Sequence, residues 1–429
     1  MLTITPRRRR HRLASALGAL PMTLLVLAGT AGSWGSSAAG RPAAPASAAL
    51  APFAQASAVG RSDGATPSTI GTRAVDLALV LPRGVRDSAG LTPARVQAQV
   101  AAAAAYWRDE TAGMVTFSVD RTHGWYRSGL ACAHTSALWS QASALFGSPA
   151  ETFGNAGRHL VIVVPPARAA AAGCGYGFGT QSEGTAAALR PGQGGGTVFV
   201  TNTTPSLLAH ELGHNLGLDH AGSLTCPGVQ DGRYDGRRWS HGCRVREYDD
   251  LFDVMGYSSP GYGEGHLNVA HVDELGLEPN AIRTAGSGRS TYLIPALSRR
   301  GAPGRGVKLI DGSGAVYYLE YRTATGRDAA APKTPLRGRP GLRILRADPR
   351  LPGSSGSLEL DATPPRRLSA APTPADYDRA LPVGGRFVAA SGRIAVRLES
   401  VSRAGARVTV YVGPRGAAGL GPRPAIRRG

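Results

Sequence analysis

The sequence predicts a mixed α/β domain followed by a β-sandwich-like domain. Between residues 75 and 201, apolar strand patterns alternate with helical patterns, which is typical of a mixed twisted sheet with crossover helices. Beyond residue 285 the pattern changes to period-two alternation between Gly, Pro and Ser turns, which favours a β-sandwich. A largely apolar, histidine-bearing helix separates the two patterns, and we expect it to be buried beside a cleft. The 429 residues are enough for two or three domains with buried cores.

Residues 1–39 have the pattern of a signal peptide. Arg7–Arg10 form a basic region, an apolar stretch follows from 13 to 31, and small-residue cleavage sites come after it. An uncleaved membrane anchor is the alternative, but Pro21 and several glycines disfavour a spanning helix. Residues 40–72 are rich in Ala, Ser, Pro and Gly, which predicts a linker or short pro-segment. We therefore expect a secreted, extracellular mature protein without a membrane span, and the Ala, Gly and Arg richness indicates a bacterial chain.

The first domain is expected to span residues 73–285. A helix from 93 to 108 has Thr92 as its cap and Pro93 at its first position, and its apolar face should pack on the sheet. The other expected elements are strands at 75–81, 114–119, 159–164 and 197–201, a helix at 131–146 and an irregular glycine-rich stretch at 173–196.

The histidine-bearing helix has clear start and stop signals. Thr204 is a suitable N-cap and Pro205 suits the first helical position. Nothing from there to Leu216 breaks a helix, and Gly217 can adopt the left-handed conformation that ends one. The chain is therefore expected to turn sharply just after this helix.

Three histidines around this turn have the spacing of metal ligands. His210 and His214 are four residues apart, so both imidazoles project from one face of the helix, as two ligands of one Zn²⁺ must. His220 can return after the turn as a third ligand, which leaves the metal one open position, as in catalytic sites. Glu211 lies about 100° around the helix from His210, so it can flank the metal as a general base without ligating it.

The four cysteines favour disulfides in an exported chain. Cys132, Cys174, Cys226 and Cys243 allow three connectivities. We favour Cys132–Cys174 and Cys226–Cys243, the second of which would close a loop downstream of His220. A Cys/His zinc cluster is the alternative, but no C-x-x-C spacing supports it.

The region beyond the histidines is expected to begin with a helix from 269 to 275, capped by Asn268. A β-rich domain should then occupy residues 286–413, and residues 414–429 should form a disordered basic tail. The expected strands are 290–297, 306–310, 315–322, 342–345, 357–361, 386–390, 394–402 and 407–412.

The string from His210 to His220 resembles the metzincin zinc-protease signature, H-E-x-x-H-x-x-G-x-x-H, at every fixed position. Metzincins also have a methionine turn beneath the zinc, and Asp253–Tyr257 resembles that turn. The resemblance implies that Met255 forms an apolar floor under the metal. It also implies that Tyr257 lies near the metal, where it can steady an oxyanion, and a surface or packing tyrosine is the alternative interpretation.

Within the metzincins, the chain is similar to gametolysin-like secreted proteases. The similarity covers about residues 75–412 and is sharp only from 204 to 275. Its motifs include Glu247–Gly256 and Gly265–Asn268. The resemblance implies a secreted zinc endopeptidase acting on extracellular proteins, with Zn²⁺ as cofactor. Gametolysin-like enzymes cleave matrix or wall proteins, and that substrate class is not carried over to this chain.

The formal net charge is +19, and Lys308 and Lys333 are the only lysines. Such basicity could indicate nucleic acid or an anionic envelope surface as partner. The arginines are scattered, however, and no nucleic-acid motif accompanies them. We expect protein or peptide substrates, no specific nucleic acid, and a monomer.

Two classes of protein are compatible with this sequence. The first is a zinc endopeptidase. The second is a secreted binding protein whose metal site serves stability while the β-rich domain binds a partner. Glu211 favours the enzyme, because a purely structural zinc site has no use for a general base beside it.

Four other polar residues have simpler interpretations than a role in the site. Asp219 could orient His220 as a neighbouring carboxylate, but an exposed position is the simpler interpretation. We interpret His241 as a loop residue without function, and His134 and His159 as structural.

Overall fold

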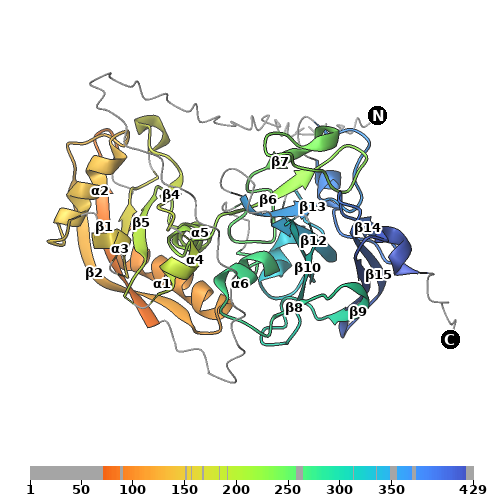
Figure 1. The fold of residues 1–429 in the computed structure, drawn as a ribbon. Coiled ribbons are helices and arrows are strands. Elements are labelled where there is room, and N and C mark those ends of the chain that lie inside the picture. The colour runs from red at the N-terminus through yellow and green to blue at the C-terminus, as the bar shows by residue number, and fades with distance from the viewer. Residues whose placement is uncertain are drawn as a thin grey trace, which may run out of the picture. The chain divides into compact units, whose positions relative to one another are not determined.

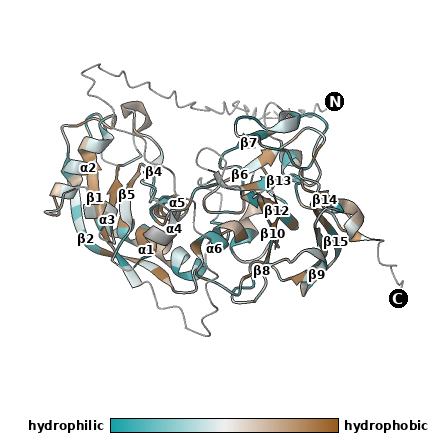
Figure 2. Ribbon diagram, in the orientation of Figure 1, coloured by the Kyte–Doolittle hydropathy of each residue, from teal (hydrophilic) through white to brown (hydrophobic). Residues whose placement is uncertain are grey.

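The first part of the fold is a five-stranded sheet with the strand order β2-β1-β3-β5-β4 (Figure 1). The strands are β1 (Gly71–Leu81), β2 (Val115–Arg127), β3 (Arg158–Val163), β4 (Gly177–Gly179) and β5 (Gly195–Val200). Neighbouring strands are parallel except β4, which runs antiparallel to β5 and forms one edge. Figure 2 shows brown, hydrophobic residues along β1 and β5. Burial on both faces explains such continuous apolar strands.

Helices cover both faces of this sheet. Val161 and Val163 face α1 (Pro93–Glu110) and α5 (Pro205–Asn215), whereas Leu160 and Ile162 face α2 (Thr135–Ala144) and α3 (Thr152–Asn155). Successive strand residues point to opposite faces, so one apolar run contributes to two cores. The expected cap of α1 is present, because Thr92 Oγ1 accepts a 3.2 Å hydrogen bond from Arg95 N. Two short elements, η1 (Ala170–Ala172) and α4 (Thr185–Ala188), lie in the connections.

A second sheet of seven strands has the order β7-β6-β13-β12-β11-β10-β8. Its strands are β6 (His220–Thr225), β7 (Arg244–Arg246), β8 (Ile282–Thr284), β10 (Gly306–Ile310), β11 (Val316–Tyr321), β12 (Leu342–Ala347) and β13 (Ser355–Leu360). The parallel pairing of β6 with β13 joins the segment just after α5 to the C-terminal half of the chain.

A third sheet shares an apolar core with the second. Its order is β14-β15-β16-β9, formed by β14 (Arg386–Val388), β15 (Ile394–Ser402), β16 (Gly405–Val412) and β9 (Gly288–Ile294). Tyr317 and Leu319 of β11 belong to this shared core, whereas Tyr318 packs in the core that contains residues of α6 (Val269–Leu275). The seven-stranded sheet therefore has a sheet on one face and a helix on the other.

The computed structural model describes residues 71–421 apart from 87–89, 150–151, 156, 167–168, 183, 191, 258–263, 313, 335, 348–354 and 370–372. The expected signal peptide at 1–39 and nearly all of the 40–72 linker lie outside the described residues. Linker residues 71 and 72 instead begin β1. All described residues fall in one compact unit.

The mixed α/β class with several sheets and few helices is confirmed. Four short strands were not predicted: β4, β6, β7 and β8. Because β6, β7 and β8 pair into the sheet formed mainly by later strands, hydrogen bonds cross the expected boundary at residue 285. The domain bounds themselves stay a prediction.

The predicted tail is partly structured. Residues Gly416–Leu420 form the 3₁₀ helix η5, and Leu420 is 1% exposed because it packs against Ala395 and Tyr411. Apolar burial of Leu420 therefore orders this part of the chain. The other short 3₁₀ helices are η2 (Ser240–Gly242), η3 (Gly326–Lys333) and η4 (Pro374–Tyr377).

Both favoured disulfides are present. Cys132 pairs with Cys174, with 4.9 Å between Cα atoms, and Cys226 pairs with Cys243, with 4.0 Å between Cα atoms. The second bridge closes the loop between β6 and β7, so it keeps the ends of these two strands together.

A buried cluster of charges lies on the face of the seven-stranded sheet opposite the shared core. Arg343 donates to Asp250 at 2.7 Å and to Glu320 and Glu359 at 2.8 Å each. Arg322 donates to Glu320 at 2.7 Å and to Asp328 at 2.8 Å. Both arginines are about fully buried, so their charges depend on these carboxylates for compensation.

Arg343→Ala should lower the free energy of unfolding by about 3–5 kcal/mol, because it leaves three buried carboxylates without a shared cation. Urea denaturation followed by tryptophan fluorescence measures this loss. Arg339→Ala is the control, since its ion pair with Asp378 is 64% and 49% exposed and should contribute less than about 1 kcal/mol. Equal losses in the two variants would show that the cluster does not stabilise the fold.

Candidate metal centre

Three buried histidines come together at the end of α5. His210 and His214 lie on α5, and His220 is the first residue of β6. Their ring centroids are 4.7 to 5.4 Å apart, and one nitrogen from each lies within 4.8 Å of the others. The predicted convergence of His220 with the other two histidines is therefore present.

The local sequence explains how the third histidine returns. Thr204 caps α5 by accepting from Leu207 N, and Pro205 is its first residue, as predicted. Gly217 follows the helix with φ of +90°, a conformation that favours glycine. A Cβ at this position would also collide with the backbone of Gly184 and Thr185. The chain then enters β6, whose pairing with β13 fixes His220.

Two of the histidines have a defined tautomer. His210 Nδ1 donates to the carbonyl of Val254, and His214 Nδ1 donates to the carbonyl of Leu218, each at 2.8 Å. A carbonyl can only accept, so the Nε2 atom of each ring keeps its lone pair. His220 Nδ1 lies 3.7 Å from a carboxylate oxygen of Glu247.

The electrostatics keep these imidazoles neutral. Burial, followed by the neighbouring histidines, lowers the pKa of His210 to about 3 and the pKa of His220 to about 2. Burial also lowers the pKa of His214. Neutral imidazole is the form that binds a metal.

The donor set fits a single metal ion. Imidazole nitrogens about 2.1 Å from a shared Zn²⁺ in a tetrahedral arrangement are about 3.4 Å apart. Side-chain shifts of about 1 Å would bring nitrogens that lie within 4.8 Å of one another to this spacing. Three neutral nitrogens, two of them oriented by carbonyl hydrogen bonds, can therefore hold a metal ion.

Glu211 is buried next to the histidines, with 5% of its surface exposed. Burial raises the pKa of its carboxyl group to about 8. A dication at the histidine cluster would act in the opposite direction and favour the carboxylate. Glu211 lies against β4, because a Cβ on Gly177 would collide with its carboxyl group and a Cβ on Gly179 with its backbone oxygen. The two glycines on the edge strand thus provide the space for this side chain.

Met255 forms part of the support beneath α5. The residue is fully buried, and a Cβ on Gly213 would collide with its sulfur atom. Its carbonyl accepts from Ala221 N at 2.9 Å, just after His220. The adjacent Val254 carbonyl orients His210, so this turn contacts both parts of the histidine cluster. An apolar floor is the role that the resemblance implied for Met255.

The methionine turn is held by buried polar contacts. Asp253 accepts from Met255 N at 2.7 Å and from His271 Nδ1 at 3.2 Å. It also accepts from the backbone of Asn268, whose side chain caps α6 through a 3.0 Å bond from His271 N. The turn is therefore fixed to α6 as well as to α5.

Tyr257, which the resemblance places near the metal, lies at the surface. It is 42% exposed and within electrostatic range of Tyr176. Tyr248, which no sequence pattern singled out, lies against the histidines. Its ring centroid is 4.0 Å from that of His220. Glu247 was missed as well. The only available signal was their position in the segment that resembles gametolysin-like proteases.

Asp219, His241 and His159 do not belong to the histidine cluster. Asp219 accepts from Gln181 Nε2, and Glu247 is the acidic side chain beside His220. His241 is exposed, and His159 is buried with its Nδ1 2.9 Å from Asn215 Oδ1, in agreement with a structural role.

No protein-family model matches the sequence, and a search of curated proteins finds no similar chain.

Within the described part of the chain, none of the helices has the length and apolarity needed to cross a membrane.

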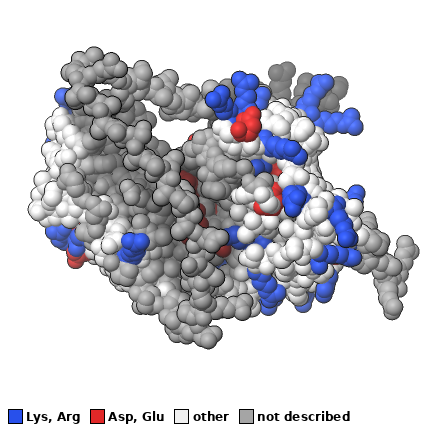
Figure 3. Space-filling model, in the orientation of Figure 1, with Lys and Arg blue, Asp and Glu red and all other residues white. Residues whose placement is uncertain are grey.

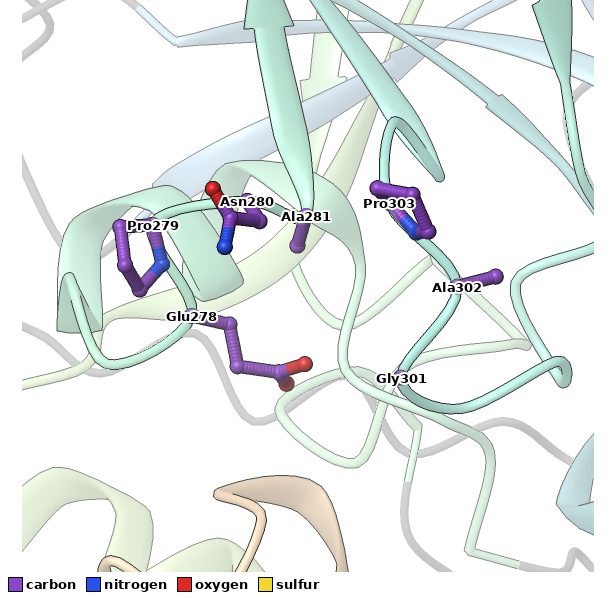
Figure 4. A pocket seen from close by; sticks show the side chains of 7 residues that line it. All are labelled: Glu278, Pro279, Asn280, Ala281, Gly301, Ala302 and Pro303. Carbon is purple, nitrogen blue, oxygen red and sulfur yellow. The ribbon is translucent and has the colours of Figure 1, made fainter. Parts of the chain in front are cut away.

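Two other surface features carry no site. The pocket in Figure 4 is lined by residues 278–281 and 301–303, and its one charged side chain, Glu278, is paired with Arg300 and Arg305. Lys and Arg side chains form separate groups on the face shown in Figure 3, which agrees with the scattered arginines of the sequence.

The mature protein should bind about one Zn²⁺ per chain, and His220→Ala should bind less than about a tenth of that, because two imidazoles and water hold zinc weakly. Elemental analysis of freshly purified protein measures the content. His241→Ala, which changes an exposed histidine outside the cluster, should keep full zinc. Full occupancy in His220→Ala would exclude it as a ligand.

Gly177→Ala should destabilise the protein by about 1–3 kcal/mol, since the added methyl group meets the Glu211 carboxyl group and Leu207. Combining it with Glu211→Ala should recover about 1 kcal/mol of that cost in a double-mutant cycle. Thermal unfolding of the wild type, the two single variants and the double variant gives the coupling free energy between Gly177 and Glu211. Gly175→Ala is the control, because a Cβ there meets nothing within 4 Å. Zero coupling would mean that Gly177 does not accommodate Glu211.

Proposed function

We propose that this protein is a secreted zinc-dependent endopeptidase of the metzincin type. The observation that carries the proposal is the position of Glu211, a buried carboxyl group on the same helix as His210 and His214. Three neutral histidines and an adjacent acid are the groups needed for hydrolysis by a metal-activated water. The signature resemblance from His210 to His220 agrees with this chemistry.

His210, His214 and His220 would hold Zn²⁺, which would supply an open coordination position, a bound water with a pKa near 7 and polarisation of a carbonyl group. Glu211 takes a proton from the attacking water and later delivers it to the leaving amine. His210 and His214 keep their orientation through the carbonyls of Val254 and Leu218.

An extended peptide is the substrate class that the neighbouring strand favours. β4 is one of the two edge strands of the five-stranded sheet, and its Gly177 and Gly179 lie next to Glu211. Edge strands present unpaired backbone groups that can align an extended chain by β-augmentation. A peptide bound there would pass close to the candidate general base.

Secretion is proposed on independent grounds. The N-terminal sequence has the pattern of a signal peptide, and both disulfides are compatible with an oxidising, extracellular environment.

The non-enzymatic alternative, a secreted binding protein with a stabilising metal, makes a different prediction for Glu211. In that case the carboxyl group would have no chemical role, and burying it would be a cost without compensation. Hydrolysis of unfolded casein with and without a chelator separates the two classes.

Glu211→Ala should keep about one zinc and the native fold yet lower kcat by at least about 10²- to 10⁴-fold, because it removes the general base. Casein hydrolysis, circular dichroism and zinc content of the same preparation measure all three properties. The control is Glu264→Ala, which removes a partly buried acid outside the histidine cluster. Substantial activity in Glu211→Ala would overturn the mechanism, and inactive zinc-loaded wild type would favour the binding protein.

A further inference from the structure

Tyr248 covers two of the three histidines. Its ring centroid is 4.0 Å from that of His220, with 44° between the planes, and 5.9 Å from that of His210, with 28° between the planes. The ring therefore packs on two imidazoles of the candidate metal centre. Tyr248 is 38% exposed, so the ring contacts the histidines on one side and remains accessible to a ligand from solvent.

Two acidic side chains are near the phenol group of Tyr248. Its hydroxyl group is within electrostatic range of Glu247 and of the candidate general base, Glu211. A phenol hydroxyl group can donate a hydrogen bond through its O–H.

The backbone at Tyr248 is in an unfavourable conformation for a bulky residue. Its φ is +59°, in the left-handed region that aromatic residues rarely adopt. Such conformations persist only where the surrounding structure fixes them, and they cluster at functional sites.

The neighbours of Tyr248 supply that constraint. Asp249 accepts from Ser223 Oγ at 2.6 Å and from Tyr377 Oη at 2.8 Å, and it also pairs with Arg379. Asp250 is held by Arg343 at 2.7 Å. The segment is therefore anchored immediately after Tyr248 by Arg343 of β12 and by Tyr377 and Arg379, which lie between β13 and β14.

We propose that Tyr248 is a further catalytic residue, whose hydroxyl group donates a hydrogen bond to the oxygen that becomes anionic when the peptide carbonyl is attacked. This inference rests on the proposed function. It assigns an oxyanion donor to a position that the signature does not contain. It also gives the C-terminal part of the chain a role in the site, because Arg343 and Arg379 hold the segment that carries this tyrosine.

Inorganic phosphate, a tetrahedral anion, tests the donor without requiring turnover. The protein is loaded with Co²⁺ in place of zinc, and phosphate binding is followed through the visible absorption of the cobalt ion. Tyr248→Phe should keep its cobalt, because the ring that packs on His220 remains, but should raise the Kd for phosphate by about tenfold or more. Tyr234→Phe, which removes a hydroxyl from a ring that packs on Trp239, should leave the Kd unchanged.

Casein hydrolysis by the zinc form gives the second measurement. Tyr248→Phe should lower kcat by about 10²-fold with little change in KM, because the contact forms mainly in the transition state. Tyr257→Phe, assayed in parallel, tests the separate role that the resemblance gives that residue.

Failure of this inference can be told apart from failure of the proposed function. Wild-type phosphate affinity and wild-type kcat in Tyr248→Phe would overturn the inference and leave the peptidase standing. A wild-type protein that binds cobalt and phosphate but cleaves no casein would overturn the peptidase and, with it, the catalytic role of Tyr248. A wild-type protein that takes up no cobalt would overturn both.

Discussion

The ion pairs of Arg343 connect the candidate metal centre to the C-terminal half of the chain. Its guanidinium group joins Asp250, just before the methionine turn, to Glu320 and Glu359 on the seven-stranded sheet. Buried charges of this kind contribute little net stability compared with apolar packing, but losing one partner is costly. These ion pairs therefore hold the segment that carries Tyr248, Val254 and Met255 against the seven-stranded sheet.

This connection changes how the β-rich region is understood. The sequence predicted a catalytic domain followed by a β-rich domain, which in the non-enzymatic alternative would bind a partner. In the structure, β6 begins at His220 and pairs with β13, so the third histidine belongs to the same sheet as Arg343. The C-terminal strands thus position residues of the site directly, and no independent ligand is needed to explain their presence.

Local signals predicted much of this site. The cap at Thr204, the four-residue spacing of His210 and His214, and the turn at Gly217 all depend on neighbours in the sequence. The spacing of His220 after Gly217 also predicted its return. Tyr248 and Glu247 were missed because they lie in an irregular loop, where no periodicity indicates which side chains face a site.

The sequence by itself determined the mixed α/β class, the helices α1, α5 and α6 with their caps, both disulfide pairings and the histidine set. Most of these features follow from hydrogen bonds and periodicities within short segments. The disulfides follow from the small number of ways in which four cysteines can pair. Only the tertiary structure decided that β6 pairs with β13, that Arg343 binds three acids, and that Tyr248 covers His220. Each of these depends on contacts between distant segments, which burial and charge compensation select only when the whole chain has folded.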